Sequence, residues 1–420
     1  MTPQIKQRIE QIRRGEVPEG YKKTKAGVIP SEWELHPLSK HLTESRIPGT
    51  NGAVAKKLTV KLWNKGVFEK REVHEGSEST TYYKRKAGQL IYSKLDFLNC
   101  AFGIIPDHLN GYESTQDLPC FDINDVDPYY LLTYATQRNF YTHFGMIADG
   151  GRKARRVGPE DMLSFPLIYP SLHEQEKIAE ILSTQDKLIA LKEKLIEEKK
   201  RQKKALMQQL LTGKKRLPGF SSEWKKQKMS DILCERKEEN KDQSLRICSV
   251  AVNSGVVDQR EHLGKSMAAS DTSNYNVVHY GDIVYTKSPT GAFPYGIVKQ
   301  SQLTENGAVS PLYGVYKPTS YEIGYLLNEY FMHPNNANGY LLPIINKGAK
   351  NTINISNATF ITPSLYLPTN FEEIKKLVQI FKVANKEIEI LQKDLDQEKQ
   401  KKKALMQLLL TGIVRVEVKQ

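Results

Sequence analysis

The chain contains the same unit twice, so its fold must be one that can be built from two similar halves. Residues 203–213 recur as residues 402–412, with ten of eleven positions identical. Shorter matches come earlier in the same order, at offsets that grow steadily from 191 to 199 residues. They pair 31–33 with 222–224, 88–94 with 281–287, and Pro166 with Pro363. Because chance matches would not stay colinear, we infer a duplication whose second copy gained small loops.

Each copy divides into a variable part of about 140 residues and a helical part that matches far more closely. The variable parts contain short apolar or alternating runs, at 89–93, 165–169 and 282–286, which are separated by Gly, Pro and Asn. This pattern predicts two small mixed α/β domains.

The helical parts carry apolar residues at alternating spacings of three and four, as in the seam of a coiled coil. In the helix expected over 371–410 the seam is Ile374, Leu377, Phe381, Ala384, Ile388, Leu391 and Leu395. In the helix expected over about 172–212 the seam is Ile178, Leu182, Ile189 and Ile196, with Gln185 and Lys192 at the positions of Ala384 and Leu391. Each helix offers one apolar stripe, so we expect the two to pair with each other rather than to form separate homodimeric coiled coils.

The expected fold is therefore α+β, with two small mixed α/β domains separated by two long antiparallel coiled-coil helices and related by a pseudo-twofold axis. Roughly 40 helical residues give a rod of about 60 Å, which is longer than a small domain is wide. The expected segments are an N-terminal helical segment at 1–20, a first domain at 21–170, a central helix at 171–213, a second domain at 214–369, a C-terminal helix at 370–412 and a tail at 413–420.

The charge of the chain favours a polyanionic partner. Lys and Arg outnumber Asp and Glu by 61 to 48, which gives a net charge of +13 and a pI near 9.2. Charge alone is equally compatible with a solvated basic surface. A twofold-related pair of domains, however, matches DNA half-sites about one helical turn apart, roughly 34 Å centre to centre.

Cysteine spacing and hydropathy exclude several other classes of protein. Cys100, Cys120, Cys234 and Cys248 are far apart and form no CxxC motif, so neither a zinc site nor a disulfide framework is indicated. No apolar run approaches the roughly 18 to 20 residues that span a bilayer, and residues 1–15 lack a signal-type apolar core. We therefore expect a cytoplasmic protein.

The two ends of the central helix follow a recognisable pattern. Residues 170–179 combine a proline, a leucine, a Glu-Gln pair and Ile-Ala, and residues 206–213 read Leu-Met-Gln-Gln-Leu-Leu-Thr-Gly. These segments resemble the opening and the end of the central conserved helix in the specificity subunits of type I restriction-modification enzymes. The second helix departs from this pattern, because its opening at 367–373 lacks the Glu-Gln pair.

Two further segments extend the resemblance over nearly the whole chain. Residues 217–220 followed by Trp224, and residues 20–30 followed by Trp33, are similar to the two segments that open the family's target-recognition domains. Each motif alone is only moderately specific, but their doubled order is highly specific.

The resemblance implies a DNA-binding subunit that reads a bipartite target in double-stranded DNA, with one recognition domain for each half. It also implies docking of two methylation subunits and, in the full complex, two motor-nuclease subunits. The chain itself would be non-catalytic, with no cofactor of its own. S-adenosylmethionine and ATP would belong to the partner subunits.

The residues themselves give no support for catalysis by this chain. The sequence Asp127-Pro128-Tyr129-Tyr130 resembles an adenine methyltransferase loop, but it lacks the second proline, and no glycine-rich strand-turn-helix precedes it. A turn before a helix is the simpler interpretation. No GxxxxGK[ST] motif for ATP and no spaced acidic cluster of a nuclease after Pro106-Asp107 are present.

Residues at matched positions of the two variable domains, most of them basic, form the candidate DNA-binding set. In the first domain they are Lys84, Arg85, Lys86, Tyr92 and Lys94 around one strand, and Arg152, Lys153, Arg155 and Arg156 in a glycine-hinged loop. In the second domain they are Tyr285, Lys287 and Ser288 at the equivalent strand end, and Lys347, Lys350 and Asn351 in the equivalent loop. A solvated loop is an even alternative for any one of them, and Tyr92 and Tyr285 also fit the core of a strand.

Two other functions remain compatible with the sequence. One is a structural scaffold whose helices bridge proteins and whose globular parts bind peptides. The other is the recognition part of a related restriction enzyme with a different subunit arrangement. Salt-sensitive binding to duplex DNA would separate the scaffold from the DNA-binding proteins.

Overall fold

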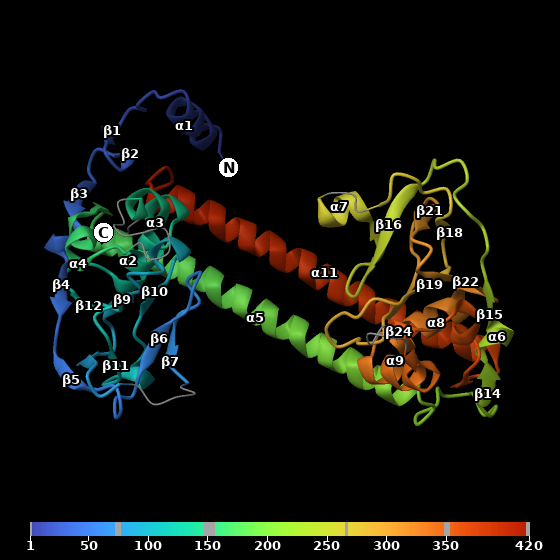
Figure 1. Ribbon diagram of the computed structural model, residues 1–420. Helices are drawn as coiled ribbons and strands as arrows, with labels where there is room; N and C mark the ends of the chain where they lie inside the picture. Colours follow the sequence, from blue (N-terminus) through green and yellow to red (C-terminus); the bar gives the residue numbers. More distant parts are fainter. Residues whose placement is uncertain (1, 72–76, 147–155, 265–267, 348–352, 417–420) are drawn as a thin grey trace. The chain divides into compact units, whose positions relative to one another are not determined.

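The computed structural model describes residues 2–71, 77–146, 156–264, 268–347 and 353–416 (Figure 1). The chain forms two compact units. Unit 1 comprises residues Met1–Glu193 together with Asp394–Gln420, and unit 2 comprises Lys194–Lys393. Each unit therefore contains one variable domain, the beginning of one long helix and the end of the other.

Unit 1 is built on a four-stranded antiparallel sheet in the order β10-β9-β12-β4. These strands are β10 (Phe102–Ile104), β9 (Leu90–Tyr92), β12 (Cys120–Ile123) and β4 (Leu42–Ser45). The helices of the domain are α2 (Pro128–Ala135), α3 (Arg138–Gly145) and α4 (Pro159–Ser164), with short 3-10 helices η1 (Leu38–Lys40), η2 (Phe97–Asn99) and η3 (Asp107–Leu109). The Asp127 side chain caps α2 by accepting from the N–H of Tyr130, so the Asp127–Tyr130 sequence is a helix start.

Unit 2 repeats this sheet strand for strand in the order β20-β19-β22-β15. Its strands are β20 (Ile297–Gln300), β19 (Ile283–Thr286), β22 (Gly314–Pro318) and β15 (Leu233–Glu235). Its helices are α6 (Met229–Ile232), α7 (Gln259–Leu263), α8 (Tyr321–Phe331), α9 (Pro334–Leu341) and α10 (Asn357–Phe360), with the 3-10 helix η4 (Leu342–Ile344). The two copies thus share one topology as well as their sequence motifs.

A strand pair beside each sheet leads the chain into a long helix. In unit 1, β3 (Glu34–Pro37) pairs with β13 (Pro166–Tyr169), and α5 (Leu172–Leu210) follows. In unit 2, β14 (Lys225–Lys228) pairs with β25 (Ser364–Leu367), and α11 (Phe371–Leu410) follows. The N-terminal residues add α1 (Pro3–Arg13) and the hairpin of β1 (Tyr21–Thr24) and β2 (Gly27–Pro30).

The accessory sheets differ between the units. Unit 1 has the sheet β11-β8-β5, formed by Glu113–Ser114, Thr81–Lys84 and Pro48–Asn51, and the hairpin of β6 (Leu58–Val60) and β7 (Val67–Glu69). Unit 2 has the sheet β17-β16-β21-β18, formed by Gly255–Asp258, Arg246–Ala251, Gly307–Val309 and Asn276–Val278, and the small pair β23 (Asn346–Lys347) and β24 (Ile353–Asn354). A common sheet therefore carries different attachments in the two copies.

Each hydrophobic core is closed by the start of one long helix and the end of the other. In unit 1, Ile178 and Leu182 of α5 pack in the same core as Leu409 and Leu410 of α11. In unit 2, the same arrangement joins Ile374, Leu377 and Phe381 of α11 to Met207 and Leu210 of α5 and to Leu211, which follows that helix. Leu182 and Phe381, both expected in the seam, are fully buried.

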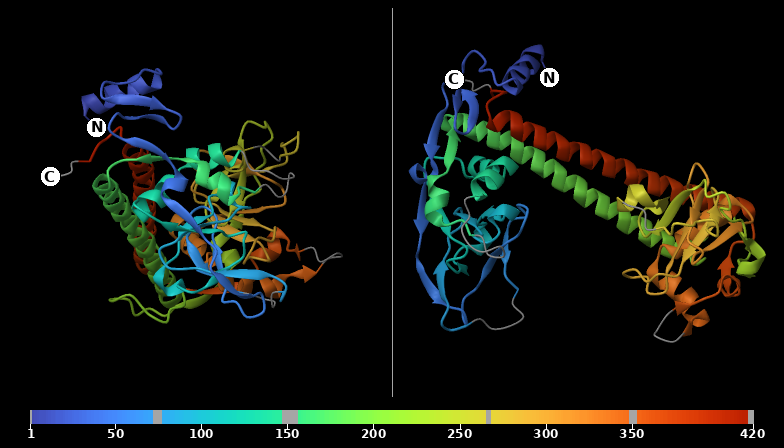
Figure 2. Two further views of the ribbon diagram at one scale, coloured as in Figure 1. Left: turned by 90° about the vertical axis from the view of Figure 1, so that its left-hand side faces the viewer. Right: turned by 45° about the horizontal axis from the view of Figure 1, so that its top comes forward.

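The helices run antiparallel within unit 1, where their ends lie side by side (Figures 1 and 2). Gln185 donates to Oε2 of Glu398 at 2.7 Å, and Lys192 forms ion pairs with Asp394 and Glu398. The polar seam residues Gln185 and Lys192 thus have charged partners on the facing helix. In unit 2 the helices are linked by an ion pair of 2.6 Å between Lys199 and Glu387.

Among the described residues, no helix is both long and apolar enough to cross a membrane. Nor does that part of the chain group three or more His, Cys, Asp or Glu side chains in a way that could hold a metal ion.

Candidate nucleic-acid interface

The three consecutive basic residues at the end of β8 have different environments. Lys84 and Lys86 are exposed, whereas Arg85 is one of the largest fully buried side chains in the chain. The Arg85 guanidinium donates to Ser114 Oγ and to the carbonyl oxygens of Ser45 and Leu118, at 2.8 to 3.1 Å. Burial lowers the pKa of Arg85, and these acceptors hold the charge inside the domain. Arg85 is therefore corrected from a DNA contact to a structural residue, because its donors already have partners.

Tyr92 and Tyr285 are also core residues. Both side chains are fully buried, and their hydroxyls donate to the carbonyl oxygens of Val157 and Tyr295. Tyr92 packs on the Phe121 ring, and Tyr285 packs on the Phe360 ring. Burial raises both tyrosine pKa values. Neither ring is available for stacking on a base. The expectation that Tyr92 and Tyr285 contact DNA is therefore wrong, and both are residues of the hydrophobic core.

Lys94 joins the end of strand β9 to the end of the glycine-hinged basic loop. Its N–H donates to the carbonyl of Asp117 at 3.0 Å, and its carbonyl accepts from the N–H of Val157 at 3.2 Å. Arg156, which is exposed, lies 3.8 Å from the Asp117 carboxylate. The structure therefore brings Lys94 and Arg156 together, while Arg152, Lys153 and Arg155 lie outside the described residues.

The equivalent corner of unit 2 is formed by Lys287 and Ser288. Lys287 is half-buried and Ser288 is exposed. Burial lowers the pKa of Lys287, and the nearby Glu235 partly opposes that shift. Ile355 is the equivalent of Val157 in unit 1, at an offset of 198 residues, and both side chains are buried. Lys350 and Asn351 fall outside the described residues, and the same holds for the side chain of Lys347.

The structure adds three arginines that the sequence motifs did not indicate. Arg46 follows β4 and lies against the same small hollow as Lys94, where it pairs with Glu44 at 2.9 Å. In unit 2, Arg246 and Arg260 line a cavity of about 480 Å³ beside β16 and α7. The Nε of Arg246 is buried and makes no hydrogen bond within the described residues. None of these three arginines lies in a basic run, so nothing in the sequence distinguished them from other single arginines.

Fold and surface together define a two-domain protein in which equivalent sheets present basic side chains at equivalent strand ends. Residues 116–201 match the family model of the type I restriction modification DNA specificity domain. The matched segment contains β12, the helices α2 to α4 and most of α5.

A protein described as a specificity subunit of the MjaX type I restriction enzyme from Methanocaldococcus jannaschii is 26% identical over 222 residues. The match covers 46% of this chain and 49% of the relative, so the chain spans about half the length of the curated relative it matches.

Two solved structures share the fold over most of their length. The S subunit of a type I restriction-modification system from M. genitalium has a TM-score of 0.52 at 10% identity, covering 92% of this chain and 97% of that one. A chain from a study of complex assembly and conformational transition in the type I R-M system has a TM-score of 0.54 at 13% identity, covering 92% and 99%. Residues 116–201 are thus similar to the type I restriction modification DNA specificity domain, and the fold of the chain is similar to that of two solved chains from such systems.

Proposed function

We propose that the chain reads a bipartite DNA target, one half with each domain, as the non-catalytic recognition subunit of a type I restriction-modification complex. The observation that carries this proposal is the pair of four-stranded sheets with identical strand order and different accessory sheets. A common scaffold with different attached surfaces suits the reading of two different half-sequences, because base readout depends on the local side chains that reach the groove.

The basic and polar residues at the two strand ends and in the two loops would supply phosphate contacts. In domain 1 these are Lys84, Lys86, Lys94 and Arg156, together with the loop residues Arg152, Lys153 and Arg155. In domain 2 they are Lys287 and Ser288, together with Lys347, Lys350 and Asn351. Phosphate contacts give affinity but carry no sequence information. The stronger candidates for base contacts are therefore the arginines outside these strand ends and loops, which are Arg46, Arg246 and Arg260.

The long helices would act as a coiled-coil spacer between two domains related by a pseudo-twofold axis. The charged contacts of Gln185 and Lys192 with α11 support this role, since polar seam residues fix the register of paired helices. A fixed register would fix the separation of the two half-targets.

Apolar residues outside the seam support docking of two methylation subunits. Leu191 of α5 and Ile390 of α11 are both exposed and are equivalent at an offset of 199 residues. Val383, also exposed, borders a groove of about 520 Å³ in unit 2. An exposed apolar residue at the equivalent position of each long helix is consistent with one methylation subunit docking on each helix. Methyl transfer from S-adenosylmethionine and ATP-driven cleavage would belong to these partners and to the two motor-nuclease subunits.

A domain exchange tests the proposal. Residues 26–166 are replaced with the corresponding domain of another specificity subunit, and methylated adenines are mapped in DNA from cells that carry the complete complex. One half of the target should change and the other should stay the same. The matched exchange of 217–363 should change the opposite half. A change of both halves after either exchange would contradict one domain per half-target.

A further inference from the structure

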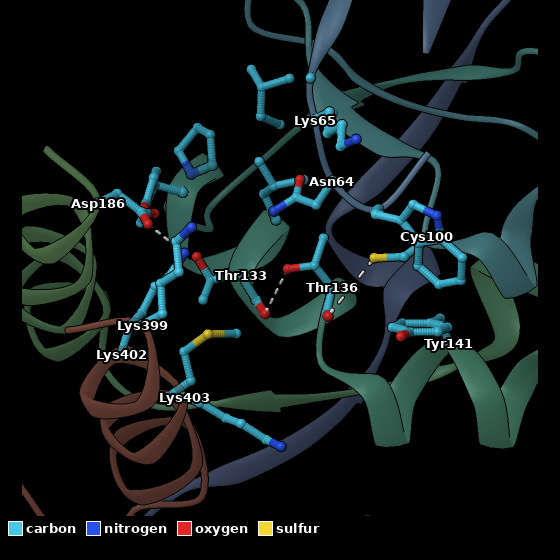
Figure 3. Close-up of a pocket in the computed structure, with 18 residues that line it drawn as sticks. Asn64, Lys65, Cys100, Thr133, Thr136, Tyr141, Asp186, Lys399, Lys402 and Lys403 are labelled. Carbon is cyan, nitrogen blue, oxygen red and sulfur yellow. Dashed lines mark hydrogen bonds and ion pairs between the residues drawn. The ribbon is translucent and has the colours of Figure 1, made fainter. Parts of the chain in front are cut away.

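An open cleft of about 680 Å³ lies within unit 1, between the turn of the β6–β7 hairpin, helix α2 and the last turns of α11 (Figure 3). Lys65 lines it from the hairpin turn, and Lys399, Lys402 and Lys403 line it from α11. Asp186 of α5 is the one acidic residue in the lining. The cleft therefore carries an excess of positive charge on walls that come from both the domain and the long helix.

Two of the four lysines are free to meet an anion. Lys399 pairs with Glu193 at 2.6 Å, and Lys402 pairs with Asp186. Lys65 and Lys403 are exposed and form no ion pair with any described residue. Lys61, which is also exposed, adds a further positive charge beside the hairpin turn.

An exposed tryptophan stands at the same cleft in a backbone conformation that is unfavourable for it. Trp63 has φ of 60° and Asn64 has φ of 52°, in the left-handed region. The N–H groups of these residues donate to the carbonyls of Asn99 and Cys100, both at 2.8 Å, which holds the turn in place. The Trp63 side chain nevertheless remains 57% exposed. The turn thus keeps Trp63 in an unfavourable backbone conformation while its ring is exposed to solvent. This combination points to a binding role for Trp63.

The equivalent position in unit 2 is closed. Tyr129, Thr133 and Asp186 of unit 1 correspond to Tyr325, Glu329 and Asn385 of unit 2, at offsets of 196, 196 and 199 residues. Lys402 corresponds to Lys203.

In unit 2 the acid comes from the domain, and Glu329 binds Lys203 at 2.8 Å with side-chain exposures of 2% and 11%. Asn385 completes the network by donating to Glu329 and to the Tyr325 hydroxyl. In unit 1, Lys402 and Asp186 are 22% and 39% exposed and face open space. Both copies thus have a lysine at this position, but the lysine of the ion pair is more accessible to solvent in unit 1 than in unit 2.

We propose that the unit 1 cleft binds the sugar-phosphate backbone of DNA, with Lys65 and Lys403 on phosphates and the Trp63 ring against the nucleic acid. This inference rests on the proposed DNA-binding function and adds a contact site outside the strand ends. Lysine contacts to phosphates supply affinity that does not depend on sequence, and an exposed aromatic ring beside them offers an apolar surface to the sugars of the same backbone. The cleft is open rather than enclosed, which suits a continuous polymer.

The first test measures the salt dependence of binding of the full chain to a mixed-sequence duplex. The double variant Lys65→Gln/Lys403→Gln is compared with Lys225→Gln/Lys226→Gln, which removes the same charge from two exposed lysines of β14. Loss of two phosphate contacts should lower the log–log salt slope by about 2, so that wild type loses roughly tenfold more affinity than the cleft variant between 50 and 200 mM salt. The control should keep the wild-type slope.

The second test uses the wild-type protein and its tryptophan fluorescence. The chain has three tryptophans, and Trp33 and Trp224 are only 1% and 4% exposed, so a soluble quencher such as acrylamide reaches mainly Trp63. DNA should protect this emission from acrylamide, and Trp63→Phe should remove the protected signal.

Four outcomes would overturn the inference. A cleft variant with the wild-type slope, or Trp63 equally quenched with and without DNA, would leave the proposed function standing and remove the cleft from it. A cleft variant that binds DNA normally but no longer co-purifies with a methylation subunit would assign the cleft to an acidic segment of that partner. Wild-type protein that shows no salt-sensitive DNA binding would overturn the proposed function together with the cleft.

Discussion

Glu373 occupies in unit 2 the place that Glu174 occupies in unit 1. Each lies in the first turn of a long helix and accepts a hydrogen bond from a tryptophan indole, Trp33 to Glu174 at 2.9 Å and Trp224 to Glu373 at 3.3 Å. Each also binds an arginine just beyond the end of the other helix, Arg415 in unit 1 and Arg216 in unit 2. The second helix therefore keeps the glutamate of the Glu-Gln pair, and only Gln175 is replaced, by Ile374.

This cluster should stabilise unit 1 strongly. Glu174 is buried, and Arg415 binds both of its carboxylate oxygens at 2.6 and 3.0 Å. Arg415→Met should lower the free energy of unfolding by about 3 kcal/mol, because it leaves a buried carboxylate without its partner. Urea unfolding followed by circular dichroism measures this change.

Two comparisons make the test of this cluster specific. Adding Glu174→Gln to Arg415→Met should restore part of the loss, because the stranded charge is gone. Arg14→Met, which breaks the exposed pair of Arg14 with Glu10, should cost less than about 1 kcal/mol. Equal losses for Arg415→Met and Arg14→Met would mean that the buried contact contributes no more than a surface pair.

Neighbouring residues at the end of β8 should separate stability from DNA binding. Arg85→Lys should destabilise domain 1 by about 2 kcal/mol, because an ammonium group cannot reach the separated acceptors of the guanidinium. Lys86→Gln, at an exposed position, should change stability by less than about 0.5 kcal/mol but lower the salt slope of DNA binding by about 1. The reverse pattern would place Arg85 on the DNA and Lys86 in the fold.

The stability of unit 2 should depend on pH through Lys299. This lysine of β20 is buried, and burial lowers its pKa from 10.5 to about 8, with Glu329 opposing the shift and Lys203 adding to it. Between pH 8 and 10.5 the unfolded state therefore binds more protons than the folded state, so this residue makes the free energy of unfolding rise with pH in that window. Below pH 8 both states are protonated and the penalty for the buried charge is constant.

Lys299→Met removes the titrating group and should stabilise unit 2 at pH 7. Its advantage over wild type should shrink by on the order of 2 kcal/mol between pH 8 and 9.5, at about 1.4 kcal/mol per pH unit. Unfolding midpoints at pH 7, 8 and 9.5 measure the trend, and Lys225→Met on the exposed strand β14 controls for loss of one charge. Parallel pH profiles for wild type and Lys299→Met would show that Lys299 keeps an ordinary affinity for its proton.

The spacer role of the helices predicts a change in target spacing. Four residues inserted after Glu193 and four after Lys393 fall where the two units meet along the chain, so the pairs of Lys192 with Asp394 and of Lys199 with Glu387 are retained. Such an insertion adds about 6 Å and a residual rotation of about 40°, close to the turn of one DNA base pair, about 35°. A heptad seam absorbs four residues by local unwinding.

The expected result is a preferred spacer altered by about one or two base pairs with both half-targets unchanged. Mapping methylated adenines in cells that carry the complete complex gives this result directly. Full modification of the original spacing by the inserted protein would exclude the spacer role, provided that its unfolding curve matches that of wild type.

The sequence by itself determined the features that depend on local order along the chain. The repeat, the long helices beginning at Leu172 and Phe371, and the buried seam residues Leu182 and Phe381 all follow from spacing, because a helix places its side chains by a fixed period. The strand-like runs predicted mixed α/β domains in the same way. The order of the strands in each sheet could not be predicted, since it depends on pairing between distant segments.

Only the tertiary structure decided which basic and aromatic side chains face solvent. Lys84, Arg85 and Lys86 are alike in sequence, but Arg85 is buried by acceptors from Ser45, Ser114 and Leu118, which lie 29 to 40 residues away in the chain. The cleft at Trp63 likewise needs a hairpin from the beginning of the chain and lysines from its end. Burial and charge depend on what distant segments bring into contact, and a single stretch of sequence does not contain that information.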